Sequence, residues 1–89
     1  MATFDEVLVA VHNERRFQDD KWGSIASNPH DFGTWFILIE AELAEAKEAL
    51  IKGGSGRNSL RNELIQVAAL CFAALEQHGV KDSGEGRSI

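Results

Sequence analysis

The chain has 89 residues, of which 44% are hydrophobic and 26% are charged, and its formal net charge is −5. This composition is typical of one globular domain and excludes a disordered chain. The acidic balance also argues against a partner such as long nucleic acid, because phosphate backbones are bound by clustered Lys and Arg.

The first expected helix begins after Thr3 and ends near Trp22. Thr3 and Glu6 fit the capping-box pattern, in which each side chain satisfies a free backbone N–H at a helix start. The helix is followed by a loop over residues 24–30, because Pro29 and the polar residues beside it interrupt helical hydrogen bonding. The apolar positions that recur at helical spacing are Phe4, Val7, Leu8 and Val11.

Two further helices are expected over residues 32–51 and 59–78. The first is rich in Ala, Leu and Glu, which are good helix formers, and Gly53 ends it. Gly79 caps the second helix. The connector over residues 53–58 is expected to be flexible, and it is short enough that the two helices should pack antiparallel.

The stretch over residues 64–75 is apolar on nearly every side, with Gln66 as its one polar residue. Two neighbouring helices cannot cover such a helix completely, so we expect a second subunit to cover the rest. The fold class predicted is therefore all-α, an antiparallel helical bundle completed by homo-oligomerisation. It comprises one domain over residues 1–80 and a flexible C-terminal tail over residues 81–89.

Three glutamates lie at helical spacing among apolar residues. Glu42 and Glu45 share a stripe on the second helix, and Glu63 lies in a similar stripe on the third. Inward-facing carboxylates are costly unless a cation compensates them, and no basic residue is spaced to do so. Divalent metal would resolve the conflict, because Mg²⁺ and Mn²⁺ prefer hard oxygen ligands. The alternative is an ordinary solvated face, which is common for Glu on Ala-rich helices.

These residues resemble the motifs of a known family. Glu42-Leu43-Ala44-Glu45, a short Gly-containing connector and Glu63-Leu64-Ile65-Gln66 are similar to the EExxE and ExxD motifs of the MazG-like all-α nucleoside triphosphate pyrophosphohydrolases. The resemblance covers roughly residues 14–76. Flanking residues that share it are Glu14, Arg15, Gln18, Lys21, Trp22, Gly23, His30 and Trp35.

The resemblance implies a Mg²⁺-dependent enzyme, with Mn²⁺ able to substitute, that hydrolyses a nucleoside triphosphate, expected to be a dNTP. In that family, water attacks the α-phosphorus and pyrophosphate leaves. Glu42, Glu45 and Glu63 would be the metal ligands and catalytic acids. Gln66 replaces the aspartate of ExxD and could ligate metal through its amide oxygen, while Ala41 replaces the first acid of EExxE. Fewer carboxylates imply weaker metal binding.

A nucleotide site also needs cations for phosphates and flat apolar surface for a base. Lys21 and Arg57 are candidates for phosphate contacts, and Trp22 for the base. Trp35 is equally well explained as a pocket wall or as a core aromatic that anchors its helix. His30 either reaches the site or begins a turn. The expected substrate-binding residues are therefore Lys21, Trp22, His30, Trp35 and Arg57.

Two other functions stay open. A non-catalytic nucleotide-binding module could keep the scaffold without turnover, and a plain helical interaction protein could leave its glutamates solvated. The sequence has no basic region followed by an apolar segment at its start and no run of roughly 20 apolar residues, so we expect a cytoplasmic protein without a membrane span. The single cysteine, Cys71, excludes an internal disulfide.

Overall fold

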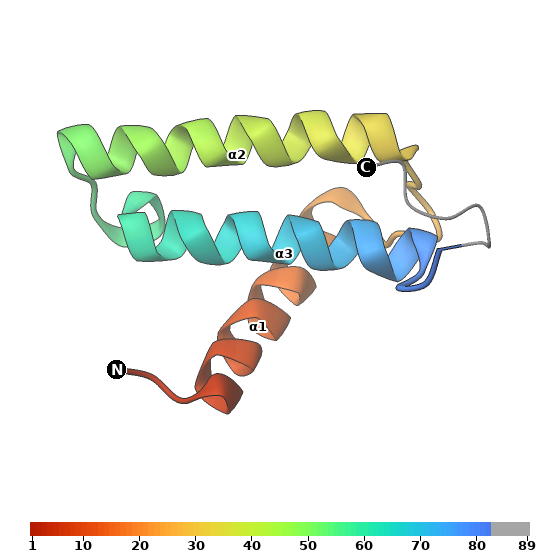
Figure 1. The fold of residues 1–89 in the computed structure, drawn as a ribbon, viewed down its shortest axis with the longest axis horizontal. Helices are drawn as coiled ribbons and strands as arrows, with labels where there is room; N and C mark the ends of the chain where they lie inside the picture. The colour runs from red at the N-terminus through yellow and green to blue at the C-terminus, as the bar shows by residue number, and fades with distance from the viewer. Residues whose placement is uncertain (83–89) are drawn as a thin grey trace.

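The computed structural model describes residues 1–82 and is helical throughout its regular structure (Figure 1). Its elements are α1 (Phe4–Trp22), α2 (Phe32–Lys52), the short 3-10 helix η1 (Gly56–Asn58) and α3 (Leu60–His78). No strand occurs within these residues. The all-α prediction is confirmed at this level. Most of the expected C-terminal tail, residues 83–89, lies outside the described part of the chain.

Each long helix begins at a side chain that caps its free N–H groups and ends at a glycine whose backbone N–H bonds to a helix carbonyl. The Thr3 hydroxyl accepts the N–H of Glu6, and the Glu6 carboxylate accepts the N–H of Thr3, which is the predicted capping box. Asp31 and Ser59 cap α2 and α3 in the same manner through their side-chain oxygens. Glycines with positive φ follow all three helices, at Gly23, Gly53 and Gly79.

Helices α2 and α3 pack side by side in antiparallel directions, and α1 crosses α3 at a steep angle (Figure 1). Among the described residues, α1 packs against α3, and no Cα atom of α1 lies within 8 Å of a Cα atom of α2. The helix α3 is therefore the central element of the fold. The separation of α1 from α2 leaves room for a cavity between them.

Many of the buried apolar residues of α2 and α3 are alanines. Ala46 and Ala49 of α2 are buried, as are Ala69, Ala73 and Ala74 of α3. Alanine side chains allow the two backbones to approach closely, but they give a core of small volume. Within the described residues no large side chain is fully buried. The coverage of α3 is incomplete, as expected for an apolar helix with two neighbours.

The connector between α2 and α3 is more ordered than a flexible linker. Residues 56–58 form η1, and Asn62 and Gln66 of α3 donate side-chain hydrogen bonds to the carbonyls of Gly56 and Arg57. A Cβ at Gly54 would lie 2.1 Å from the carbonyl oxygen of Asn58, so this close approach requires glycine. The prediction of flexibility is wrong for this turn, because its carbonyls bond to α3.

In the described part of the chain, none of the helices is both long and apolar enough to cross a membrane.

Candidate metal centre and adjoining cavity

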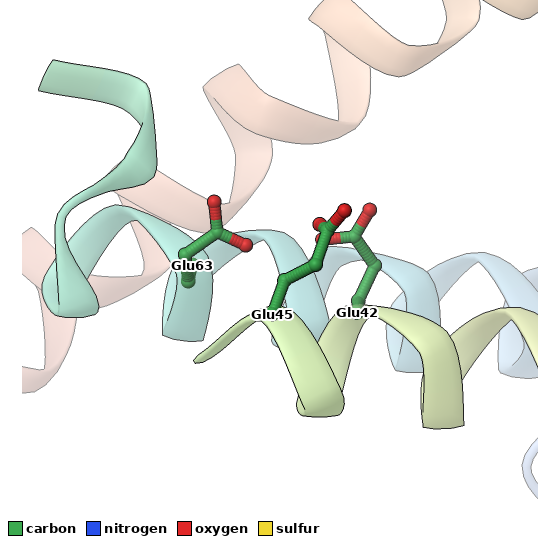
Figure 2. Close-up of side chains that lie close together, drawn as sticks. All are labelled: Glu42, Glu45 and Glu63. Carbon is green, nitrogen blue, oxygen red and sulfur yellow. The ribbon is translucent and has the colours of Figure 1, made fainter. Parts of the chain in front are cut away.

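Three glutamates meet where α2 packs against the first turns of α3. One carboxylate oxygen each from Glu42, Glu45 and Glu63 lies within 4.8 Å of the other two (Figure 2). Glu42 and Glu45 are one turn apart on α2, and the antiparallel packing brings Glu63 across from them. The stripes expected from the sequence therefore converge on a single point.

The cluster is partly withdrawn from water. Glu63 is only 3% exposed, Glu42 is partly buried and Glu45 is exposed. The Oε2 atoms of Glu42 and Glu63 are buried and have no hydrogen-bond partner among the described residues. Orphaned carboxylate oxygens are costly, and native proteins rarely leave them so without a reason.

Burial and neighbouring carboxylates raise the pKa of two of the three acids, Glu42 and Glu63. Burial raises the pKa of Glu42 to about 7, and the neighbouring Glu45 and Glu63 carboxylates add to this shift. Burial also raises the pKa of Glu63, followed by the charge of Glu45, while the positive charge of Arg57 acts in the opposite direction. Like charges this close destabilise the ionised cluster.

The residues present fit a divalent cation. Hard carboxylate oxygens on two facing helices are the donor set that Mg²⁺ and Mn²⁺ prefer. The two orphaned oxygens offer lone pairs, and a dication would replace the mutual repulsion of the acids with attraction. Glu45 is exposed, so the cluster opens to solvent on its side.

Gln66 lies one turn beyond Glu63 on α3, and its amide nitrogen bonds to η1. Its Nε2 donates to the carbonyl oxygen of Arg57 at 2.9 Å, which anchors η1 to α3. This bond leaves the amide oxygen free, so its predicted role as a metal ligand stays a prediction. Ala41, the other departure from the family motif, lines the neighbouring cavity.

A cavity of about 420 Å³ lies beside the cluster, between α1, α2 and the C-terminal half of α3. Glu42 is in its wall, so the cavity and the carboxylate cluster are continuous. The cavity brings together three of the expected substrate-binding residues. These are Trp22, His30 and Trp35.

Gln77 fixes one wall of this cavity. Its amide oxygen accepts the Trp35 indole N–H at 2.8 Å and the His30 backbone N–H at 3.0 Å. Its Nε2 donates to the His30 carbonyl, and the His30 ring packs edge-on against Trp35 at 4.8 Å between centroids. Trp35 is therefore both a core residue, 6% exposed, and a cavity wall. The two interpretations of Trp35 are compatible.

Lys21 and Arg57, the two residues expected to bind phosphate, lie in different parts of the structure. Lys21 is exposed, with its Nζ 5.1 Å from the Trp22 ring centroid, and it does not line the cavity. Arg57 lies over the Phe17 ring at 4.1 Å. Its guanidinium donates to both carboxylate oxygens of Glu14, at 3.0 and 3.3 Å. Arg57 is thus held against α1.

Sequence reasoning did not predict the long-range contacts of Arg57 and Gln77. It did not predict that Arg57, from the connector, would pair with the buried Glu14 of α1. It also gave no role to Gln77. One available signal was the spacing of Val11, Glu14 and Gln18, which places two polar residues on the inner stripe of α1, where all three are buried.

No match to this chain is found among known protein families, characterised proteins or solved structures.

Proposed function

We propose that this chain is a Mg²⁺-dependent nucleoside triphosphate pyrophosphohydrolase, which converts a (deoxy)nucleoside triphosphate and water into the monophosphate and pyrophosphate. The convergence of Glu42, Glu45 and Glu63, with two buried oxygens that lack partners, carries the proposal. The resemblance of these residues to the MazG-like motifs supports it. The cavity beside the cluster gives the rest of a nucleotide a place to bind.

The carboxylates would hold the cation, and the bound Mg²⁺ would neutralise charge on the triphosphate and polarise its phosphoryl oxygens. Glu63 is the most buried of the three and approaches from α3, so it fixes the position of the site between the helices. Glu45 is exposed and can turn toward solvent, where a carboxylate can accept a proton from an attacking water.

The cavity supplies the surfaces that a nucleoside needs. Trp22 and Trp35 offer aromatic faces, and the buried Gln18 amide and Asn28 offer polar groups that can bond to a base or a sugar. Arg57 lies in η1, which leads into the turn of α3 that carries Glu63, and its side chain is 53% exposed, so it can also contact phosphate oxygens. Lys21 does not line the cavity, but its Nζ lies 5.1 Å from the ring centroid of Trp22, which does.

Pyrophosphate release with each dNTP and NTP in the presence of Mg²⁺ tests the proposal. We expect turnover of at least one substrate, and a loss of at least about 100-fold in Glu63→Gln and Glu45→Gln. Glu48→Gln is the matched control, because Glu48 is an exposed residue of the same helix. If no triphosphate is hydrolysed, or if the cluster variants keep the wild-type rate, the chain is not this enzyme.

A non-catalytic nucleotide-binding module is the second candidate. The departures at Ala41 and Gln66 favour it, since the cluster then has three carboxylates and the Gln66 amide also anchors η1. Such a module would show Mn²⁺-dependent quenching of tryptophan fluorescence by a non-hydrolysable triphosphate without any pyrophosphate release. A plain interaction protein would show neither, and Mn²⁺ would not raise its melting temperature.

A second copy of the chain is the partner that best completes the fold. Exposed apolar side chains line a groove between α2 and α3 on the outer face, including Leu43, Leu50 and Leu64. No large side chain among the described residues is completely buried, as described above. A protein of this size gains most from burying such a surface against another subunit. Analytical ultracentrifugation measures whether the chain is a monomer or an oligomer.

A further inference from the structure

Glu14 and Arg57 form an ion pair that joins α1 to η1 next to the carboxylate cluster. The Glu14 side chain is 10% exposed, so its charge is largely removed from water and needs a partner. Arg57 donates to both of its oxygens, with the shorter contact at 3.0 Å. The Phe17 ring, one turn beyond Glu14, lies against the guanidinium face at 4.1 Å. The Arg57 guanidinium is therefore held at its edge by Glu14 and on its face by Phe17.

The backbone of Arg57 is fixed from the other side. Its carbonyl oxygen accepts the Gln66 amide at 2.9 Å, and η1 leads directly into the first turn of α3. Glu63 belongs to that first turn, because its backbone N–H bonds to the carbonyl of Ser59, the N-cap residue of α3. The Arg57 backbone is thus held next to the first turns of α3, where Glu63, the most buried acid of the cluster, lies. The positive charge of Arg57 lowers the pKa of Glu63, against the larger effect of burial.

We propose that the Glu14–Arg57 pair is a charge-balancing device that sets how tightly the carboxylate cluster binds a divalent cation. The positive charge of Arg57 lowers the affinity of the cluster for the cation. The negative charge of Glu14 cancels most of that effect, and its ion pair holds Arg57 in place. Both are positioning residues and not metal ligands. This inference rests on the proposed metal-binding function of the three glutamates.

A charge-balancing pair and a purely structural pair predict different changes in Mn²⁺ affinity when either residue is replaced. Replacing Arg57 by Gln removes a positive charge and leaves Glu14 unopposed, so Mn²⁺ should bind more tightly. Glu14→Gln leaves Arg57 unopposed, so Mn²⁺ should bind more weakly. The double variant restores the balance. A pair that only supported the fold would weaken Mn²⁺ binding in both single variants, because each would loosen the site.

Calorimetric titration of the full chain with Mn²⁺ alone, at pH 8 and low salt, measures these affinities. We expect the dissociation constant to fall about threefold to tenfold in Arg57→Gln and to rise by a similar factor in Glu14→Gln. The double variant should lie within about twofold of the wild type, and the shifts should shrink at high salt. The exposed pair Glu48 and Lys52 provides controls, and Lys52→Gln should change the constant much less than Arg57→Gln.

Arg57→Gln alone tests the inference even if Glu14→Gln does not fold. Arg57 lies in an exposed turn, so we expect its replacement to leave the fold intact. Weaker or unchanged Mn²⁺ binding in this variant overturns the inference while leaving the metal site intact. If the wild-type chain binds no Mn²⁺, both the inference and the proposed function are overturned. If the expected shifts occur but no triphosphate is hydrolysed, the inference stands and the hydrolase proposal alone fails.

Discussion

Neutralising Glu42 should make the metal-free protein more stable at neutral and higher pH. Its carboxyl group has a pKa raised from 4.5 to about 7 by burial and by Glu45 and Glu63. A group whose folded pKa is raised stabilises the fold below its unfolded pKa, and this contribution is lost as the pH rises through the folded pKa. As the pH rises from about 4.5 to about 7, ionisation of Glu42 should therefore lower the free energy of unfolding of the wild-type chain. Glu42→Gln stays neutral throughout.

The magnitude follows from the size of the pKa shift. A rise from 4.5 to about 7 corresponds to about 3 kcal/mol for a fully shielded group. Glu42 is only partly buried, so solvent screening reduces the effect to about 1–2 kcal/mol. For a domain of this size, that difference raises the melting temperature by about 5–15 °C. Well below pH 4.5 the wild-type carboxyl is largely protonated in both states, and the difference between the two proteins should be small.

Thermal melts of both proteins in EDTA, at one protein concentration and several pH values, measure this effect. Glu48→Gln is the control for removing an acid from the exposed face of α2, and its stability should change by less than about 0.5 kcal/mol. With Mn²⁺ the order should reverse, because Glu42→Gln loses a ligand while the wild type gains stability from the bound ion. A variant that is equally destabilised at every pH would refute the reasoning, because Glu42 would then be a packing residue without electrostatic strain.

Three further predictions concern the site and the surfaces around it. Gln66→Asp adds a carboxylate one turn from Glu63, so calorimetry should show Mn²⁺ binding about threefold to tenfold more tightly, and an unchanged affinity would place position 66 outside the site. Leu43→Glu puts a charge into the apolar groove of α2 and α3, so ultracentrifugation should show a smaller assembly than the wild type, and an identical mass would exclude this groove as the interface. Gly54→Ala forces its Cβ to 2.1 Å from the Asn58 oxygen, so the unfolding free energy should fall by about 1–3 kcal/mol in denaturant melts, and a neutral effect would mean that the turn readily shifts.

The helices and the meeting of the three glutamates could be predicted because their signals are local. Thr3 and Glu6 cap α1 within four residues of chain, and Gly53 ends α2 directly after its last turn. The stripe of Glu42 and Glu45 follows from the period of the helix, and the short connector dictates an antiparallel neighbour. Such features need no knowledge of distant contacts.

The partners of Arg57 and Gln77 could not be predicted, because they lie far away in the sequence. Arg57 pairs with Glu14 at a separation of 43 residues, and Gln77 bonds to His30 at a separation of 47. These contacts depend on the angle at which α1 crosses α3, which helical periodicity does not determine. The order of the connector escaped prediction for a related reason. A glycine-rich segment is flexible in isolation, and here the side chains of α3 hold its carbonyls.

Anomalous diffraction from crystals grown with Mn²⁺ locates the ion without reference to activity, and so tests whether the three glutamates bind metal. We expect an anomalous peak between Glu42, Glu45 and Glu63, with carboxylate oxygens at about 2.0–2.3 Å from the ion. Crystals in which the three side chains point apart into solvent, with no peak between them at saturating Mn²⁺, would contradict this expectation.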